Sequence, residues 1–451
     1  MNRGATVGDT SRGVAERLRC VTMAALWFLL ALGAAEALAE EHHYGILELN
    51  PTISSRYVQP GETVVVRLDV AQLEQAVKAC QAFLAYESLY LEAVSVVPGG
   101  GDWDELIYEH RAIAGDVDMA VGVLGQTTPG AGTVAEGTVA IVTFLAKDHD
   151  GVTQVDFRPN LGDLESTFLS NLAAEIVWPT TANSPSIIVD GTPPVVQVVA
   201  ATQVGRDLLA GDNAIQGTGT IVVEATDALA GLVGPPEVEV TLADGTVEAA
   251  TFIAEGPAGR YRYEWSVDAG TPNGPAAIAA VAEDRAGNIG GATGEIRVNK
   301  NRITGTIELD RFDGSAVDFS RLVTFVASGA TTRSQEVTVV GFSNHMADYV
   351  VDDVPDLATR LSAKTAWNLR RRLTVTLDAD GQASGVDFVG PKRLLGGDLN
   401  GDNLVNLQDY ARLKLAWLTA EPSADIDGDG MASVFDYVIM KLAWYLAGEP
   451  Q

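Results

Sequence analysis

The sequence predicts a mainly β protein, in which tandem β-sandwich modules are followed by a small all-α segment of two loop–helix repeats. Valine- and threonine-rich runs with alternating apolar residues recur as far as about residue 390, as is typical of half-buried strands. Glycine is abundant, with 46 residues, and aromatic residues make up only 7% of the chain. Near the C-terminus one unit occurs twice, starting at Asp398 and again at Asp425.

The length and charge of the chain limit the number of its domains and the kinds of partner it can bind. A chain of 451 residues should hold three or four domains, at roughly 100–150 residues each. The formal net charge of −30 argues against nucleic-acid binding, which needs a basic face. An acidic, glycine-rich chain with few aromatics is typical of extracellular β-sandwich modules rather than of an enzyme with a large pocket.

The N-terminus has the features of an export signal. Arg12, Arg17 and Arg19 precede an apolar run over residues 21–35, and the small residues Ala37 and Ala39 stand in front of Glu40. This order is that of a signal peptide over residues 1–39, so we expect a secreted or cell-surface protein. A retained membrane anchor is the alternative, but the apolar run is short for a span, and we expect none in the mature chain.

The cysteines predict no internal disulfide. Cys20 lies in the expected signal peptide, which would leave Cys80 alone. Because Cys80 opens an apolar strand pattern, we expect a buried small hydrophobe rather than a reactive thiol.

Residues 40–190 predict one all-β domain, a sandwich or jelly roll. Its expected strands lie at 46–49, 63–70, two within 80–97, 117–124, 138–146, 154–157 and 186–189.

Three segments of this block resemble cohesin domains. They are the Gly-Glu-Thr-Val-Val-Val strand at 61–66, the strand pair within 82–89 and the strand Gly-Thr-Val-Ala-Ile-Val-Thr-Phe at 137–144. The block departs from the cohesin pattern at Glu87 and Ser88, where Asp-Pro is typical. The resemblance implies a dockerin protein as partner. Several carbohydrate-binding modules share the sandwich, so polysaccharide binding is the alternative.

Polysaccharide binding would need a strip of exposed aromatic side chains. Trp103, Tyr108 and Trp178 are the candidate glycan-binding residues. Packing in the core or at a sheet edge is the competing explanation for all three.

The block at 192–299 begins with a proline-rich linker. Its strand patterns and its Asp-x-Ala-Gly-Asn turn lie at 221–227, 238–242, 261–265 and 279–288. These features resemble bacterial immunoglobulin-like modules, which implies a spacer. We expect Asp284 to cap the turn, with a calcium contact as the alternative.

Residues 301–390 predict a further sandwich, with strands at 303–309, 336–340, 348–351 and 373–377. The block resembles the carboxypeptidase-regulatory or prealbumin-like seven-strand sandwich. Asp378 and Asp380 look like a calcium-loop fragment, but Val389 stands at the twelfth position, so we expect a hairpin turn. The basic run at 367–372 predicts a solvated strand edge.

Two short loops near the C-terminus carry the strongest functional signal. Counted from Asp398 and from Asp425, each has oxygen-bearing side chains at positions 1, 3, 5, 9 and 12. Calcium takes about six to eight oxygen ligands, including a backbone carbonyl from position 7, and this spacing is that of an EF-hand type loop. Position 6 needs a tight turn, and Asn403 and Gly430 tolerate one. The sequence predicts two Ca²⁺ ions, bound by Asp398, Asn400, Asp402, Leu404, Asn406, Asp409, Asp425, Asp427, Asp429, Met431, Ser433 and Asp436.

An apolar helix pattern follows each loop and also repeats: Tyr, Lys, Leu, Ala and Trp between 410 and 417 match those between 437 and 444. Residues 394–451 therefore resemble a type I dockerin domain, whose loops lack a leading helix and have Asp at position 12. The resemblance implies calcium-dependent docking to a cohesin-domain protein, in a polysaccharide-degrading or cell-surface assembly. The partner contacts that it implies are Leu407, Gln408, Lys414, Leu415, Val434, Phe435, Lys441 and Leu442.

These contacts differ from the common dockerin pattern. Neither loop has the usual Ser-Thr pair at positions 10 and 11, and Leu415 and Leu442 stand where a second basic residue is frequent. The partner interface should therefore be more apolar than in the best-known systems. The duplication also implies that either helix could lead in binding.

The sequence shows no catalytic constellation. It has no Gly-x-Ser-x-Gly elbow, no His-Glu-x-x-His motif, no P-loop and no Cys–His pairing. The neighbouring His42 and His43 adjoin the expected cleavage site. We expect a non-catalytic adaptor. The alternatives are a carbohydrate-binding accessory protein that uses residues 40–190, and a glycoside hydrolase whose paired carboxylates assemble only in space.

Overall fold

The computed structural model describes residues 45–52, 56–112, 115–123, 132–159, 166–312 and 320–451. The chain divides into two compact units: residues 1–192 with 285–287, and residues 193–284 with 288–451. The expected signal peptide and the two histidines beside it lie outside the described residues. Within the described part, no helix is both long and apolar enough to cross a membrane.

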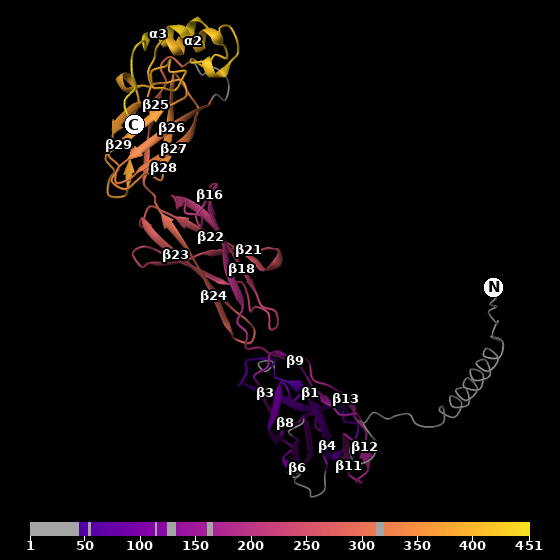
Figure 1. Cartoon of the computed structure of the whole chain (residues 1–451). Coiled ribbons are helices and arrows are strands. Elements are labelled where there is room, and N and C mark those ends of the chain that lie inside the picture. The colour runs from indigo at the N-terminus through magenta and orange to yellow at the C-terminus, as the bar shows by residue number, and fades with distance from the viewer. Residues whose placement is uncertain (1–44, 53–55, 113–114, 124–131, 160–165, 313–319) are drawn as a thin grey trace, which may run out of the picture. The chain divides into compact units, whose positions relative to one another are not determined.

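The first unit is a β-sandwich whose two large sheets share one core (Figure 1). One sheet has the order β13-β1-β3-β8-β5, with bounds Thr180–Ala182, Ile46–Pro51, Thr63–Ala71, Gly137–Ala146 and Leu91–Pro98. The other has the order β12-β11-β4-β7-β6, with β10 also paired to β4, and bounds Ile176–Val177, Phe168–Asn171, Val77–Tyr86, Asp116–Gly122, Glu105–Ala112 and Val155–Phe157. A small sheet β2-β14-β9 comprises Tyr57–Val58, Ile187–Val189 and Gly151–Thr153.

Alternation of apolar residues explains this sandwich. On β3, Val64, Val66 and Leu68 are fully buried, whereas Arg67 between them is exposed. The strands expected in this block are present. Strand β6 was not expected, because a register shift between Leu106 and Tyr108 interrupts its alternation.

The second unit begins with a sandwich of two five-stranded sheets. One has the order β16-β15-β18-β22-β21, with bounds Arg206–Asp207, Val195–Gln203, Gly217–Thr226, Arg260–Val267 and Thr251–Glu255. The other has the order β17-β24-β23-β19-β20, with bounds Asn213–Ala214, Ile289–Val298, Gly274–Glu283, Glu237–Thr241 and Val247–Ala249. Tyr263, Trp265 and Ile278 lie in the core between them.

The next sandwich, called here the third sandwich (residues 301–390), has two smaller sheets. Their orders are β28-β25-β31, with bounds Met346–Asp352, Arg302–Glu308 and Gln382–Ala383, and β27-β26-β29-β30, with bounds Thr332–Val340, Ser320–Ser328, Arg360–Lys364 and Arg371–Thr374. Phe325 stacks on Tyr349 at 4.6 Å between ring centroids in the core. The carboxylate of Asp378 accepts the N–H groups of Asp380 and Gln382 at 3.0 and 2.8 Å, so this segment is the expected turn.

The last segment, called here the tail (residues 394–451), contains the helices α2 (Leu407–Leu415) and α3 (Val434–Leu442). Figure 1 shows both helices, in yellow, next to the strands of the third sandwich. They contribute to a core in which Leu413, Ile439 and Met440 are buried.

The basic run at 367–372 is only in part the solvated strand edge that the sequence predicts: Arg371 and Arg372 lie partly exposed on the edge strand β30, but the residues before them are covered. Leu369 is 1% exposed and belongs to the core of the tail, and Trp367 packs against the same core. The indole Nε1 of Trp367 donates to the carbonyl of Pro422 at 3.0 Å, and the N–H of Arg370 donates to Asn403 at 2.8 Å. The prediction is wrong for Trp367 and Leu369, because the pattern of basic residues does not show that a later segment covers these two.

We predict that Leu369→Ala lowers the stability of the tail by about 2–5 kcal/mol, because it leaves a cavity in a closed core. Thermal unfolding of the full chain, followed by tryptophan fluorescence, measures this. Leu357→Ala is the matched control, since Leu357 is 78% exposed. An equal response of the two variants would contradict a core shared between the third sandwich and the tail.

Candidate functional site

The two loops of the tail, loop 1 (398–409) and loop 2 (425–436), fold in the same way at their first position. In loop 1 the two oxygens of Asp398 accept the N–H groups of positions 4 and 6 at 2.9 and 3.0 Å. In loop 2 the oxygens of Asp425 accept the same two groups at 2.8 and 3.1 Å. Each first aspartate therefore holds its own loop in a tight curve.

The twelfth position closes each loop. Asp409 accepts the N–H groups of positions 2, 3 and 9 at 2.9, 3.0 and 2.8 Å. Asp436 accepts those of the same positions at 2.6, 3.2 and 2.6 Å. Both side chains are fully buried, so the two ends of each loop are tied together from inside.

Positive φ angles make this curvature possible. Position 4 is Gly401 at φ +82° in loop 1 and Gly428 at +79° in loop 2. Position 6 is Asn403 at +68° and Gly430 at +92°. Glycine and asparagine are the residues that adopt this region most readily.

The ninth position links each loop to its helix. Asn406 and Ser433 are the N-caps of α2 and α3, and their side chains accept the N–H groups of Gln408 and Phe435 at 2.7 and 3.1 Å. The aspartate at position 12 completes a capping box in both cases, which stabilises the first helical turn. The loop geometry therefore determines where each helix begins.

The remaining side-chain oxygens lie on the same loops. In loop 2 an oxygen from each of Asp425, Asp427 and Asp429 lies within 4.8 Å of the others. In loop 1 the amide oxygen of Asn400 accepts the N–H of Asp402 at 2.9 Å. Neither loop contains histidine or cysteine, so all their donors are the hard oxygens that calcium prefers. Leu404 and Met431, at position 7, can add only their backbone carbonyls.

Burial and the close spacing of the carboxylates in loop 2 raise the pKa values of two of its aspartates. Burial, together with the charges of Asp436, Asp429 and Asp425, raises the pKa of Asp427 to about 7. Burial also raises the pKa of Asp436, against three backbone hydrogen bonds that lower it. A bound divalent cation would remove this penalty by neutralising the charges.

The side chains with predicted partner contacts are all exposed. Leu415 is 88% exposed, Leu407 69% and Phe435 64%, which is far more than apolar side chains on a covered helix would be. Leu446, which the sequence assigned to the core or the interface, and Val438 and Tyr445, which it did not single out, are also exposed. Large exposed apolar patches of this kind mark interaction sites.

Trp103 is not available to a glycan. The residue is 2% exposed and belongs to the core of the first unit, and its backbone pairs with Gly100. Tyr108 and Trp178 are 53% and 42% exposed. Tyr108 lies on β6 and Trp178 follows β12, at opposite edges of one sheet, roughly 19 Å apart at the usual strand spacing. They do not form a strip.

Cys80 is 1% exposed, and burial raises the pKa of its thiol to about 12. Because the thiolate is the reactive form, this cysteine is an inert core residue, as the sequence predicts.

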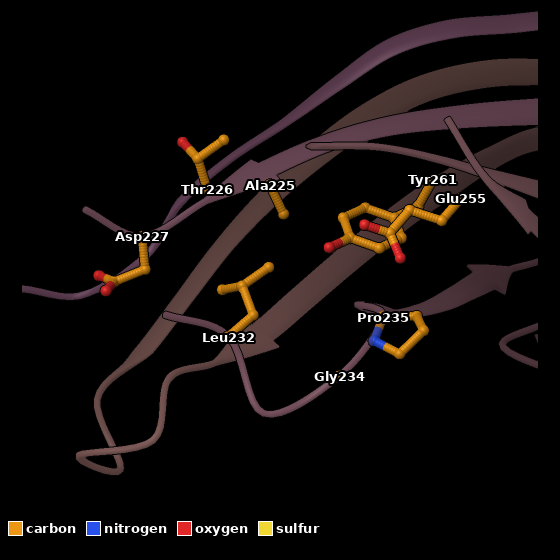
Figure 2. Close-up of a pocket in the computed structure, with 8 residues that line it drawn as sticks. All are labelled: Ala225, Thr226, Asp227, Leu232, Gly234, Pro235, Glu255 and Tyr261. Atoms are coloured by element: carbon orange, nitrogen blue, oxygen red, sulfur yellow. The ribbon is translucent and has the colours of Figure 1, made fainter. Parts of the chain in front are cut away.

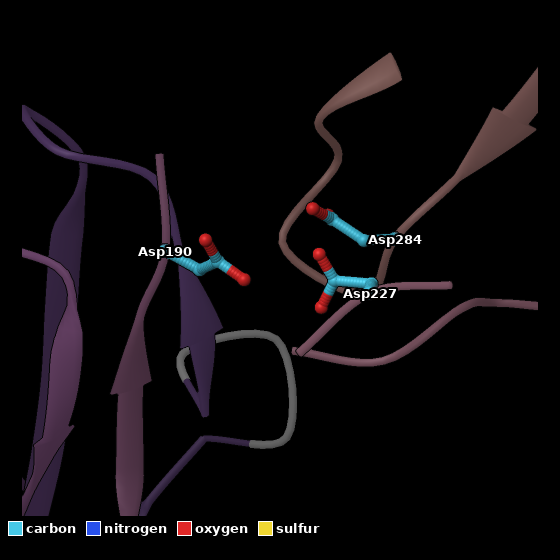
Figure 3. Close-up of side chains that lie close together, drawn as sticks. All are labelled: Asp190, Asp227 and Asp284. Carbon is cyan, nitrogen blue, oxygen red and sulfur yellow. The ribbon is translucent and has the colours of Figure 1, made fainter. Parts of the chain in front are cut away.

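A pocket of about 350 Å³ lies in the first sandwich of the second unit, beside Glu255 and Tyr261 (Figure 2). Two carboxylates, from Asp227 and Glu255, are found among the described residues that line it, and no histidine, cysteine or lysine. Figure 3 shows the carboxylates of Asp227 and Asp284 near one another in the same sandwich. Asp284 accepts the N–H and the side-chain amide of Asn288 at 2.9 and 2.8 Å, which is the expected turn cap.

Sequence reasoning missed the residues of the third sandwich that reach the loops. Lys364 forms an ion pair with Asp398. Arg321 donates to the carbonyl of Asp425 at 2.9 Å. Phe312 lies so close to Gly428 that a Cβ there would meet its ring at 2.3 Å. The glycine at the fourth position of loop 2 could have indicated the contact with Phe312. The calcium-loop motif, however, already accounts for a glycine at that position.

Comparison with known proteins gives structural neighbours only. No protein-family model and no curated protein matches the chain. Similar solved structures include a type I cohesin from Pseudobacteroides cellulosolvens, with 16% identity, 34% of this chain and 96% of its own chain covered, and a TM-score of 0.26. A type II cohesin domain from the Acetivibrio cellulolyticus cellulosome has 14% identity, covers 32% and 94%, and has a TM-score of 0.27. A second type II cohesin, from the adaptor scaffoldin ScaA of Acetivibrio cellulolyticus, has 15% identity, covers 32% and 97%, and has a TM-score of 0.27.

We predict that the calcium-free tail loses stability as the pH rises from about 4 to about 7. Asp427 has an ordinary pKa of 3.8 and a raised folded pKa of about 7, so between these values the folded state binds the proton and the unfolded state does not. Stability then falls with increasing pH. Thermal unfolding in EDTA at pH 5 and pH 8 measures the effect. In the control Asp427→Asn, which cannot titrate, the difference should shrink; an unchanged difference would contradict the assignment to Asp427.

Proposed function

We propose that this chain is a secreted, non-catalytic adaptor. Its tail acts as a dockerin, which binds two Ca²⁺ ions in loops 1 and 2 and then docks to a cohesin-bearing partner. The ions supply the charge neutralisation that the loops lack, and the residues of this chain orient the oxygens around them.

One observation supports the proposal above all others: the two loops have the same internal hydrogen bonds at corresponding positions. The backbone donates into the carboxylates at positions 1 and 12 of both loops. Two acidic turns that resembled each other by chance would have no reason to repeat this network. A repeated network with oxygen donors only is what two calcium loops require.

The apolar surface of the helices supports the docking part of the proposal. Leu407, Leu415 and Phe435 are exposed on elements whose start is set by the loops. Ordering the loops would therefore present this surface, and removing calcium would disperse it. This coupling would make docking depend on calcium.

The first unit has a separate proposed role. Its sequence resembles cohesins, so we propose a protein partner of the dockerin class for residues 40–190. Glycan binding is less well supported, because Trp103 is buried and Tyr108 and Trp178 lie at opposite edges of a sheet.

We predict that Asp398→Ala combined with Asp425→Ala abolishes the calcium response of the tail. Each substitution removes a ligand and two hydrogen bonds that shape the loop. Differential scanning calorimetry of the full chain in calcium and in EDTA should show a tail transition that shifts in the unsubstituted chain and does not shift in the variant. Capture by immobilised type I and type II cohesins should be lost in parallel.

The control is Asp378→Ala combined with Asp380→Ala, which removes two carboxylates from a turn outside the loops. This variant should keep the full response. If the unsubstituted chain melts identically in calcium and EDTA, the proposed function is rejected.

A further inference from the structure

The third sandwich supplies cations to both loops of the tail. Arg321 on β26 is 6% exposed, and its guanidinium lies 3.9 Å from the ring centroid of Trp367 and 4.9 Å from that of Phe312. Its Nη2 donates to the carbonyl of Asp425 at 2.9 Å. Lys364, at the end of β29, forms an ion pair with Asp398 and donates to the carbonyl of Asn368 at 3.1 Å.

The two contacts differ in the atom that receives them. Arg321 donates to the backbone oxygen at the first position of loop 2, and both carboxylate oxygens of that residue accept N–H groups of its own loop. Lys364 binds the carboxylate itself at the first position of loop 1. The Lys364 side chain is 14% exposed and the Asp398 side chain 0%, so water screens this pair little.

The loops therefore differ in charge. Loop 1 has three carboxylates, from Asp398, Asp402 and Asp409, and one of them already holds an ammonium group. Loop 2 has four carboxylates, from Asp425, Asp427, Asp429 and Asp436. A calcium ion that enters loop 1 meets the positive charge of Lys364 directly on a ligand carboxylate. One that enters loop 2 meets four acids and the single charge of Arg321, whose hydrogen bond goes to a backbone carbonyl.

We propose that Lys364 is an internal counter-cation that sets the calcium affinity of loop 1, so that the third sandwich is part of the metal response. This inference rests on the proposed function. Loop 2 then binds calcium first and loop 1 binds only at higher calcium. Without the metal, Lys364 compensates part of the charge in loop 1 by pairing with the buried Asp398, and the ammonium competes with the ion for the same carboxylate.

The test is Lys364→Met in the full chain, measured by isothermal titration calorimetry with calcium chloride and by melting in EDTA. Loss of the ammonium should tighten the weaker step by about tenfold or more and should lower the melting temperature of the calcium-free tail, because a buried carboxylate then lacks a partner. Tighter calcium binding together with a lower melting temperature distinguishes a counter-cation from a merely structural residue. Loss of a structural residue would weaken calcium binding and lower the melting temperature. Asp402→Ala should remove the weaker step and so assign it to loop 1.

Three further variants make the test specific. Lys364→Arg keeps the charge and should keep the weak step. Lys364→Gln, a second neutral variant, should behave like Lys364→Met. Lys392→Met removes the same charge from a residue that contacts Glu449 at 3.7 Å rather than a loop, and it should leave both steps unchanged.

The outcomes separate the two proposals. If Lys364→Met and Lys364→Gln still bind two calcium ions, but their second step is unchanged or weaker, the proposed role of Lys364 is wrong. The proposal that the two loops bind calcium would not be affected. If the tail of the unsubstituted chain binds no calcium, both proposals are wrong.

Discussion

The architecture of the tail depends on the backbone hydrogen bonds that converge on one buried aspartate in each loop. Asp409 and Asp436 each accept three N–H groups, and each also completes the cap of the helix that follows. One carboxylate thus connects loop closure with the start of a helix. Its burial is costly as long as the neighbouring acids remain charged, and this cost is the physical reason why we propose a cation in each loop.

The hydrogen bonds within each loop determine where the helix that follows it begins. The two helices are short, at nine residues each, and helices of this length are marginal by themselves in water. Their inner side chains, Leu413, Ile439 and Met440, are buried in a small core, while Leu415 and Phe435 remain in solvent. A small domain of this kind has little apolar area to bury, so contributions from its loops and from a neighbouring module carry more weight than in a large domain.

The third sandwich provides such a contribution. Leu369 and Trp367 extend the core of the tail, and Arg321 lies between aromatic rings while it reaches loop 2. Burial lowers the pKa of Arg321 to about 10, against the charges of Asp425, Asp427 and Asp436, yet the side chain stays protonated at physiological pH. The charges of the aspartates in loop 2 thus stabilise the buried guanidinium of Arg321 in its charged form.

Local patterns determined much of this protein. Alternation gave the strands of the first unit, the positions of oxygen-bearing residues gave the two loops, and the following apolar repeats gave α2 and α3, because each of these signals depends on neighbours along the chain. Only the tertiary structure decided which residues meet across it: Trp103 is buried, Leu369 is covered by the tail, and Lys364 reaches Asp398 across 34 positions. Contacts between distant segments depend on how sheets and loops pack, and no spacing in the sequence encodes them.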